Sequence, residues 1–176
     1  IIAGFVLALI TMRTVARWFA SPSVLDAIDV ELLCFANMWQ FGKRHPRYWL
    51  IALGLLKGSV PHWRKRRVLR TGFCLLQEID DLVDGDRSCD GEPLDLVEDV
   101  AQAIESSQFG DTKLMRLARA FNEDLRDVGG DVATKQALRL IRVMCRDRMR
   151  VLQNEIWQKD KLEEHLKETF TLSIDL

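Results

Sequence analysis

The sequence predicts an all-α protein, and three observations support this fold class. Apolar residues recur at three- and four-residue spacing along most of the chain, which is the period of one helix face. No segment shows the strict alternation of apolar and polar residues that is typical of a half-buried strand. The 176 residues include only 4 Pro and 10 Gly, and 48% of them are apolar. We therefore expect helices that pack as a bundle around a shared core.

The first expected helix contains residues 1–12, an apolar stretch followed by Arg13 and Arg17. A helix that crosses a bilayer needs about 20 apolar residues. We expect a buried helix here; the tail of a truncated membrane segment and an interfacial anchor are the alternatives. The next helix, 23–41, follows the start signal Ser21-Pro22-Ser23. Residues 1–45 are expected to form an N-terminal extension that can lie near a membrane, and residues 46–176 the main helical domain.

The later helices are delimited by Gly, Pro and Asp. Pro61 suits the first turn of a long helix, because a residue there needs no N–H donor. The segment 85–91 is rich in Gly, Asp and Ser and ends that helix. Gly129 and Gly130 separate two further helices, the first of which Asp111 is expected to cap. The predicted helices are 48–56, 61–84, 93–107, 112–126, 131–157 and 161–172.

Charge is unevenly distributed, although the formal net charge is only −1. Between Glu31 and Glu78 there is no acidic residue, and the stretch is rich in Arg and Lys. From Glu78 to Asp99 the sign inverts, with Arg87 as the single base. One interpretation of this pattern is a pair of solvated faces that attract each other. Nucleic-acid binding is not expected, because the neighbouring acids would repel the phosphates.

The strongest candidate for chemistry is the Asp triad, which consists of Asp80, Asp81 and Asp84. In a helix these positions project from neighbouring places, and like charges at this spacing repel each other. Ile79, Leu82 and Val83 draw the same helix toward a core, so a positive partner is expected. Arg or Lys can supply it. Mg²⁺ can also do so, because it favours one or two carboxylates together with phosphate oxygens and waters.

These residues, read with their surroundings, resemble the squalene/phytoene synthase family. The likeness is carried by the aliphatic run at 48–56, by Arg66-Arg67, and by the stretch from Gly72 to Asp84. Residues 138–151 and 162–166 are similar to a downstream segment of that family. The resemblance covers about residues 46–172.

The resemblance implies an isoprenoid-synthase fold, of which this chain would form the first half. It implies that the Asp triad binds Mg²⁺ and a prenyl diphosphate and is catalytic. Ionisation of the diphosphate would begin condensation or rearrangement in isoprenoid biosynthesis, inside a dry apolar interior. For Asp147, an ion pair with Arg150 at i+3 is the alternative. The implied substrate-binding residues are Arg47, Arg66, Phe73, Gln77 and Asp147.

A second Asp-rich motif is part of the same family pattern. The segment 126–131 looks like part of it but lies too close to Asp81, so we expect that motif beyond Leu176. Gln77 stands where the family usually has Arg. This favours an alternative, a non-catalytic relative that acts in binding or assembly. A plain helical bundle with an acidic loop for protein contacts is the third interpretation.

Cysteine usage indicates the setting of the protein. The four Cys form no Cys-x-x-Cys pair, so neither a zinc site nor a disulfide framework is expected. We expect a reduced, cytoplasmic protein, and the lipid-like substrate makes a peripheral membrane contact reasonable. A homo-oligomer is left open.

Overall fold

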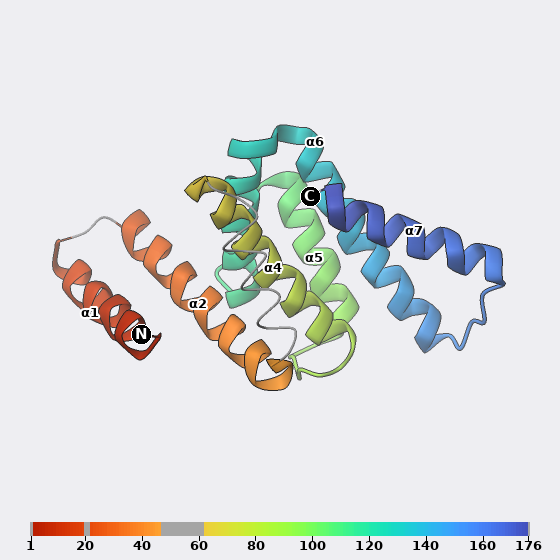
Figure 1. The fold of residues 1–176 in the computed structure, drawn as a ribbon, viewed down its shortest axis with the longest axis horizontal. Coiled ribbons are helices and arrows are strands. Elements are labelled where there is room, and N and C mark those ends of the chain that lie inside the picture. The colour runs from red at the N-terminus through yellow and green to blue at the C-terminus, as the bar shows by residue number, and fades with distance from the viewer. Residues whose placement is uncertain (1, 20–21, 47–61, 176) are drawn as a thin grey trace. The chain divides into compact units, whose positions relative to one another are not determined.

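The computed structural model describes residues 2–19, 22–46 and 62–175, and within these ranges every regular element is a helix. Figure 1 shows these helices along the chain. The prediction of an all-α protein is confirmed. No helix in the described ranges is both long and apolar enough to cross a membrane. The helices are α1 (Ile2–Phe19), α2 (Pro22–Arg44), α4 (Trp63–Val83), α5 (Pro93–Ser106), α6 (Lys113–Leu152) and α7 (Lys159–Asp175).

The chain divides into two compact units, Ile1–Cys74 and Leu75–Leu176, with the boundary inside α4. The division that the sequence predicts, between residues 45 and 46, borders on the undescribed segment 47–61 and stays a prediction. The predicted helix 48–56 lies in that segment, outside the described residues, as does Pro61.

In the first unit, α1 and α2 form a hairpin (Figure 1). The guanidinium of Arg13 binds the carboxylate of Asp29, with one Nη2–Oδ2 distance of 3.0 Å. The N-terminal half of α4 is joined to α2 by an ion pair from Arg70 to Glu31 at 2.5 Å. The Cys74 thiol contacts the Cys34 carbonyl oxygen at 3.6 Å, and both residues are fully buried.

The expectation of a buried helix at residues 1–12 is wrong for the side chains that the structure describes. Leu7, Ile10 and Met12 are 66%, 49% and 57% exposed. The helix itself forms as expected, because the stretch contains no Pro and is rich in Leu, Ile and Ala. Burial fails because α1 offers apolar residues in nearly every direction, whereas contact with α2 covers only one side.

The second unit builds its core from the C-terminal half of α4 and from α5 and α6, and α7 packs against α6. Leu76 packs against Leu140 and Val143 of α6. The side chains of Leu75, Ile79, Val97, Val100, Ile104, Leu117 and Ile141 are almost completely buried.

The predicted break at Gly129-Gly130 is confirmed, as a kink within α6. Gly130 has φ 62° and ψ −158°, a conformation that is strained for any residue with a side chain. A Cβ at Gly129 would lie 2.5 Å from the Cβ of Ala133, so Gly129 is also required.

Two boundaries of α6 differ from the predicted ones. Thr112, and not Asp111, is the N-cap, since its hydroxyl accepts a hydrogen bond from the Met115 N–H at 3.2 Å. The carboxylate of Asp111 instead pairs with Arg116 at 3.0 Å. At the other end the helix stops at Leu152, five residues early, and Asn154 turns the chain with φ 51°. The loop 153–158 then leads into α7.

Candidate functional site

The Asp triad lies where α4 ends. Ile79, Leu82 and Val83 are buried, and this apolar stripe holds the last turns of α4 in the core of the second unit. The N–H of Asp84 donates to the Asp80 carbonyl oxygen at 2.8 Å, so Asp84 continues the helical turn. Asp80 and Asp84 are exposed and neighbours on the helix surface.

Asp81 differs from its two neighbours because it is buried, with 6% of its surface exposed. The side-chain amide of Gln77 donates to its Oδ1 at 2.9 Å. Its carbonyl oxygen accepts the Arg87 N–H at 3.0 Å, which ties the following loop to the helix end. Asp81 is therefore anchored from both its side chain and its backbone.

A buried carboxylate that sequence reasoning did not select lies next to the triad. The Glu78 side chain is only 5% exposed, and it binds two cations. These are the guanidinium of Arg87 and the ammonium of Lys113, the latter at 2.8 Å. The signal in the sequence was Arg87, the one base in an acidic stretch. This cluster folds the loop after α4 back against the helix and fixes the position of the triad.

Arg148 is a second residue that the sequence did not single out. A methyl group placed at Gly85 would lie 3.9 Å from Arg148 Nη2, so α6 brings a guanidinium beside the turn that follows Asp84. Arg148 follows Asp84 by 64 residues (148 minus 84), and no periodic pattern in the sequence predicts that two residues so far apart lie close together. Only the packing of α6 reveals this proximity.

The triad does not form a preassembled metal cage. Among the described residues, no group of three or more His, Cys, Asp and Glu side chains is arranged to hold a metal ion. The reason is visible at Asp81, whose carboxylate is turned to Gln77 while Asp80 and Asp84 face solvent. Two exposed carboxylates one turn apart are what this site offers to a cation.

The predicted substrate-binding residues that the structure describes are divided between the two units. Arg47 lies outside the described residues. Arg66 and Phe73 belong to the first unit, where Phe73 packs edge-on against Phe41 with ring centroids 5.4 Å apart. Gln77 belongs to the second unit and binds Asp81. The acids that resembled a second motif, Asp127 and Asp131, are exposed on either side of Gly130.

Asp147, the remaining predicted residue, forms the ion pair that was its alternative interpretation. Arg150 Nε lies 3.0 Å from its Oδ1 at i+3. The same oxygen lies 3.7 Å from Nε2 of His165, a buried residue of α7.

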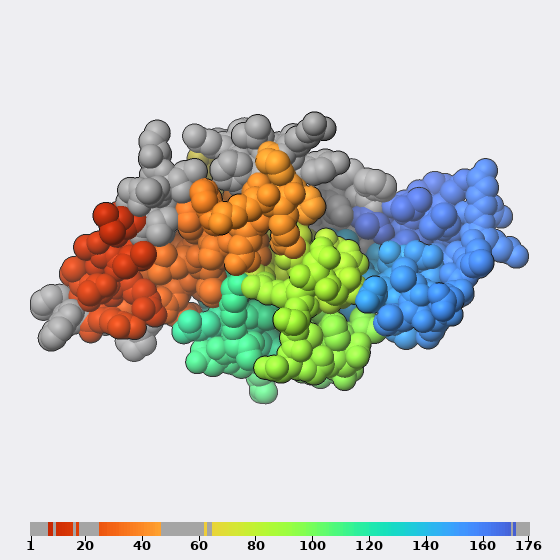
Figure 2. Space-filling model, turned by 90° about the horizontal axis from the view of Figure 1, so that it is seen from below, coloured from red at the N-terminus to blue at the C-terminus, as the bar shows by residue number. Residues whose placement is uncertain are grey.

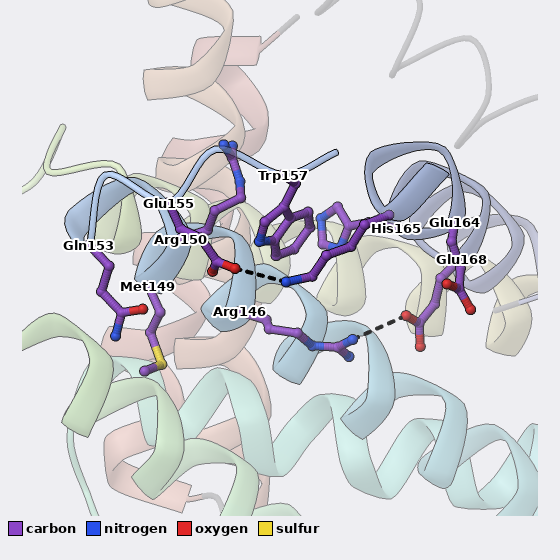
Figure 3. A pocket seen from close by; sticks show the side chains of 10 residues that line it. Arg146, Met149, Arg150, Gln153, Glu155, Trp157, Glu164, His165 and Glu168 are labelled. Atoms are coloured by element: carbon purple, nitrogen blue, oxygen red, sulfur yellow. Dashed lines mark hydrogen bonds and ion pairs between the residues drawn. The ribbon is translucent and has the colours of Figure 1, made fainter. Parts of the chain in front are cut away.

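A half-open cavity of about 340 Å³ lies at this end of the α6–α7 pair (Figure 3). The Trp157 ring is part of its lining, with Lys161 Nζ 4.5 Å and the His165 ring 4.9 Å from the ring centroid. Cations and acids both line it, and two pairs form between them: Lys161 with Glu155 at 2.9 Å, and Arg146 with Glu168 at 3.4 Å. The three cations and three acids of the lining balance in number. It is lined by Arg146, Met149, Arg150, Gln153, Glu155, Trp157, Lys161, Glu164, His165 and Glu168.

No family model, curated protein or solved structure matches this chain. The resemblance to squalene/phytoene synthases therefore depends on the motif residues alone, and it stays a prediction.

Proposed function

We propose that this protein binds a prenyl diphosphate through Mg²⁺ at Asp80 and Asp84 of the Asp triad and ionises it for condensation or rearrangement. The observation that carries the proposal is the arrangement at the end of α4. Asp80 and Asp84 present exposed carboxylates one turn apart, on a helix whose other side is buried.

The donor set fits the cation. Mg²⁺ binds hard oxygen ligands and commonly takes one or two carboxylates, with substrate phosphate oxygens and waters completing its shell. Asp80 and Asp84 meet this requirement without a third protein ligand. Asp81 would have to give up its bond to Gln77 in order to bind metal, so we assign it to holding the helix end in place. A bound Mg²⁺ ion would neutralise the charge that develops on a leaving diphosphate.

Cationic side chains of the chain would assist. Arg148 is beside Gly85, and a guanidinium can donate two hydrogen bonds to one phosphate group. Glu78, Arg87 and Lys113 neutralise one another, so their role is to hold the loop and not to bind the ligand.

A non-catalytic relative is the second candidate, and Gln77 favours it. This neutral amide occupies the position where the family usually has Arg, and it is engaged with Asp81. The neutral Gln77 thus replaces an Arg that would stabilise the leaving diphosphate. Such a protein would bind a prenyl diphosphate without cleaving it.

Calorimetric titration of the chain with farnesyl and geranylgeranyl diphosphate, with and without Mg²⁺, tests the proposal. We expect Mg²⁺-dependent binding that weakens about tenfold or more in Asp80→Asn and in Asp84→Asn, since each removes a charged ligand. Asp90→Asn is the matched control, because Asp90 is an exposed acid of the loop that follows α4. Equal affinities for all four proteins would refute the metal site.

Release of inorganic pyrophosphate in the same mixtures separates the two candidates. Pyrophosphate that accumulates with Mg²⁺, and not in Asp80→Asn, supports the enzyme. Tight binding without release supports the non-catalytic relative.

A further inference from the structure

The described side chains of α1 form an apolar surface that the rest of the described chain does not cover. Leu7, Ile10, Met12 and Val15 are 66%, 49%, 57% and 54% exposed, and Ala8 between them is also exposed. In Figure 2 the described part of α1, in red, is open on the face that is drawn.

The angular spread of these residues is wide. With 3.6 residues per turn, they cover an arc of about 200° around the helix. Arg13, which binds Asp29 of α2, falls on the opposite side of the helix. One side of α1 is thus bound to α2, and the exposed apolar side chains that the structure describes are spread, with Thr11 and Thr14 among them, over more than half of the helix circumference.

The two hydroxyls within this arc are satisfied without water. Thr11 Oγ1 donates to the Leu7 carbonyl oxygen at 2.8 Å, and Thr14 Oγ1 donates to the Ile10 carbonyl oxygen at 2.9 Å. This back-bonding lets a hydroxyl enter an apolar medium at low cost. The arc therefore has no hydroxyl donor that requires solvent.

The charges of α1 are all of one sign. The helix has no Asp or Glu, and its cations, Arg13 and Arg17, both lie near its C-terminal end. Arg17 is exposed at the edge of the apolar arc. An apolar face with a cation at its rim matches the boundary between acyl chains and anionic headgroups. A second α1 would bring another Arg17 and no acid to pair with it, so charge does not favour pairing of two α1 helices.

We propose that α1 lies along the surface of an anionic lipid bilayer. Leu7, Ile10, Met12 and Val15 enter the acyl boundary, and Arg17 lies at the level of the phosphates. This inference is independent of the proposed function, because it uses no residue of the Asp triad.

Co-sedimentation with vesicles tests the proposal on the full chain. One set contains phosphatidylcholine mixed with phosphatidylglycerol, and the other contains phosphatidylcholine alone. We expect the protein to pellet preferentially with the anionic vesicles. The double variant Leu7→Glu/Ile10→Glu should lower the partition coefficient about tenfold or more, since two apolar contacts are replaced by repelled charges.

The matched control is the double variant Val132→Glu/Ile156→Glu. These side chains are 69% and 94% exposed, so they undergo the same chemical change at similar exposure outside α1. Its partition coefficient should equal that of the unmodified chain. Circular dichroism checks that each variant keeps its helix content.

Arg17→Glu provides a test that leaves the apolar arc intact. It should abolish the preference for anionic over neutral vesicles. If Leu7→Glu/Ile10→Glu does not fold, Arg17→Glu decides, and an unchanged preference overturns the proposal.

Three other results would overturn it. The first is no pelleting of the unmodified chain with either vesicle. The second is an equal loss of binding in the Val132→Glu/Ile156→Glu control. The third is a stable dimer in vesicle-free buffer that Leu7→Glu/Ile10→Glu dissociates, which would identify a second copy of the chain as the partner.

Discussion

Helices α1 and α5 are both rich in apolar residues, yet they differ in how far these side chains are buried. In α5, Val97, Val100, Ala101 and Ile104 are at most 1% exposed, and the acids on the other side of the helix face solvent. In α1, large apolar side chains remain exposed. The difference lies in pattern and not in quantity, since α5 has one apolar stripe with a polar back and α1 has apolar residues almost all round. A helix of the first kind completes a protein core, whereas one of the second kind calls for another apolar surface.

The largest expected effect comes from truncating one residue of each helix. Ile104→Ala should lower the free energy of unfolding by about 2–5 kcal/mol, because it leaves a cavity in a close-packed core. Leu7→Ala should change it by less than about 0.5 kcal/mol, because that side chain is already exposed. Urea unfolding followed by circular dichroism measures both. Similar losses for the two variants would show that α1 is packed in solution.

A second comparison, between a buried and an exposed acid, can be made within the second unit. Glu78→Gln should lower the free energy of unfolding by about 1–3 kcal/mol, because two charged hydrogen bonds to a buried side chain are lost. Asp86→Asn, at an exposed acid of the following loop, should cost less than about 0.5 kcal/mol. A Glu78→Gln protein as stable as the unmodified chain would mean that the Arg87 and Lys113 contacts do not stabilise the fold.

The smallest effect is expected at Glu168, where α7 contacts α6. Burial by itself would raise the pKa of this carboxyl. The hydrogen bond from Arg139, at 2.8 Å, and the charge of Arg146 outweigh it, and the pKa is lowered below its ordinary 4.5. A lowered folded-state pKa stabilises the protein above pH 4.5, and this stabilisation is lost as the pH falls through the folded-state pKa.

Glu168→Gln tests that pH dependence. At pH 7 the variant should be less stable than the unmodified chain by under about 1 kcal/mol, since both arginines are well exposed. The gap should close as the pH drops below 4.5, as measured by urea unfolding at several pH values. A gap that widens in acid would mean that folding raises the pKa of Glu168 and does not lower it.

The position of the candidate site could mostly be predicted from the sequence, but the contacts of its acidic side chains could not. The periodic stripe of Ile79, Leu82 and Val83 indicated correctly that the triad lies at the end of a packed helix. It did not indicate that Asp81 turns to Gln77, or that Glu78 is the buried acid with two cations. Those outcomes depend on where Arg87 and Lys113 lie in the folded chain, and the only signal in the linear sequence was Arg87, the one base in an acidic stretch.

Local signals account for what the sequence by itself determined. These are the all-α class, the start of α5 at Pro93 and the kink at Gly130, because apolar period, ring geometry and the freedom of glycine act within a few residues. The tertiary structure alone decided that α1 stays exposed, that Thr112 and not Asp111 caps α6, and that Arg148 reaches Gly85. Each of these depends on which groups from distant parts of the chain compete for the same contact, and that competition is resolved only when the helices pack.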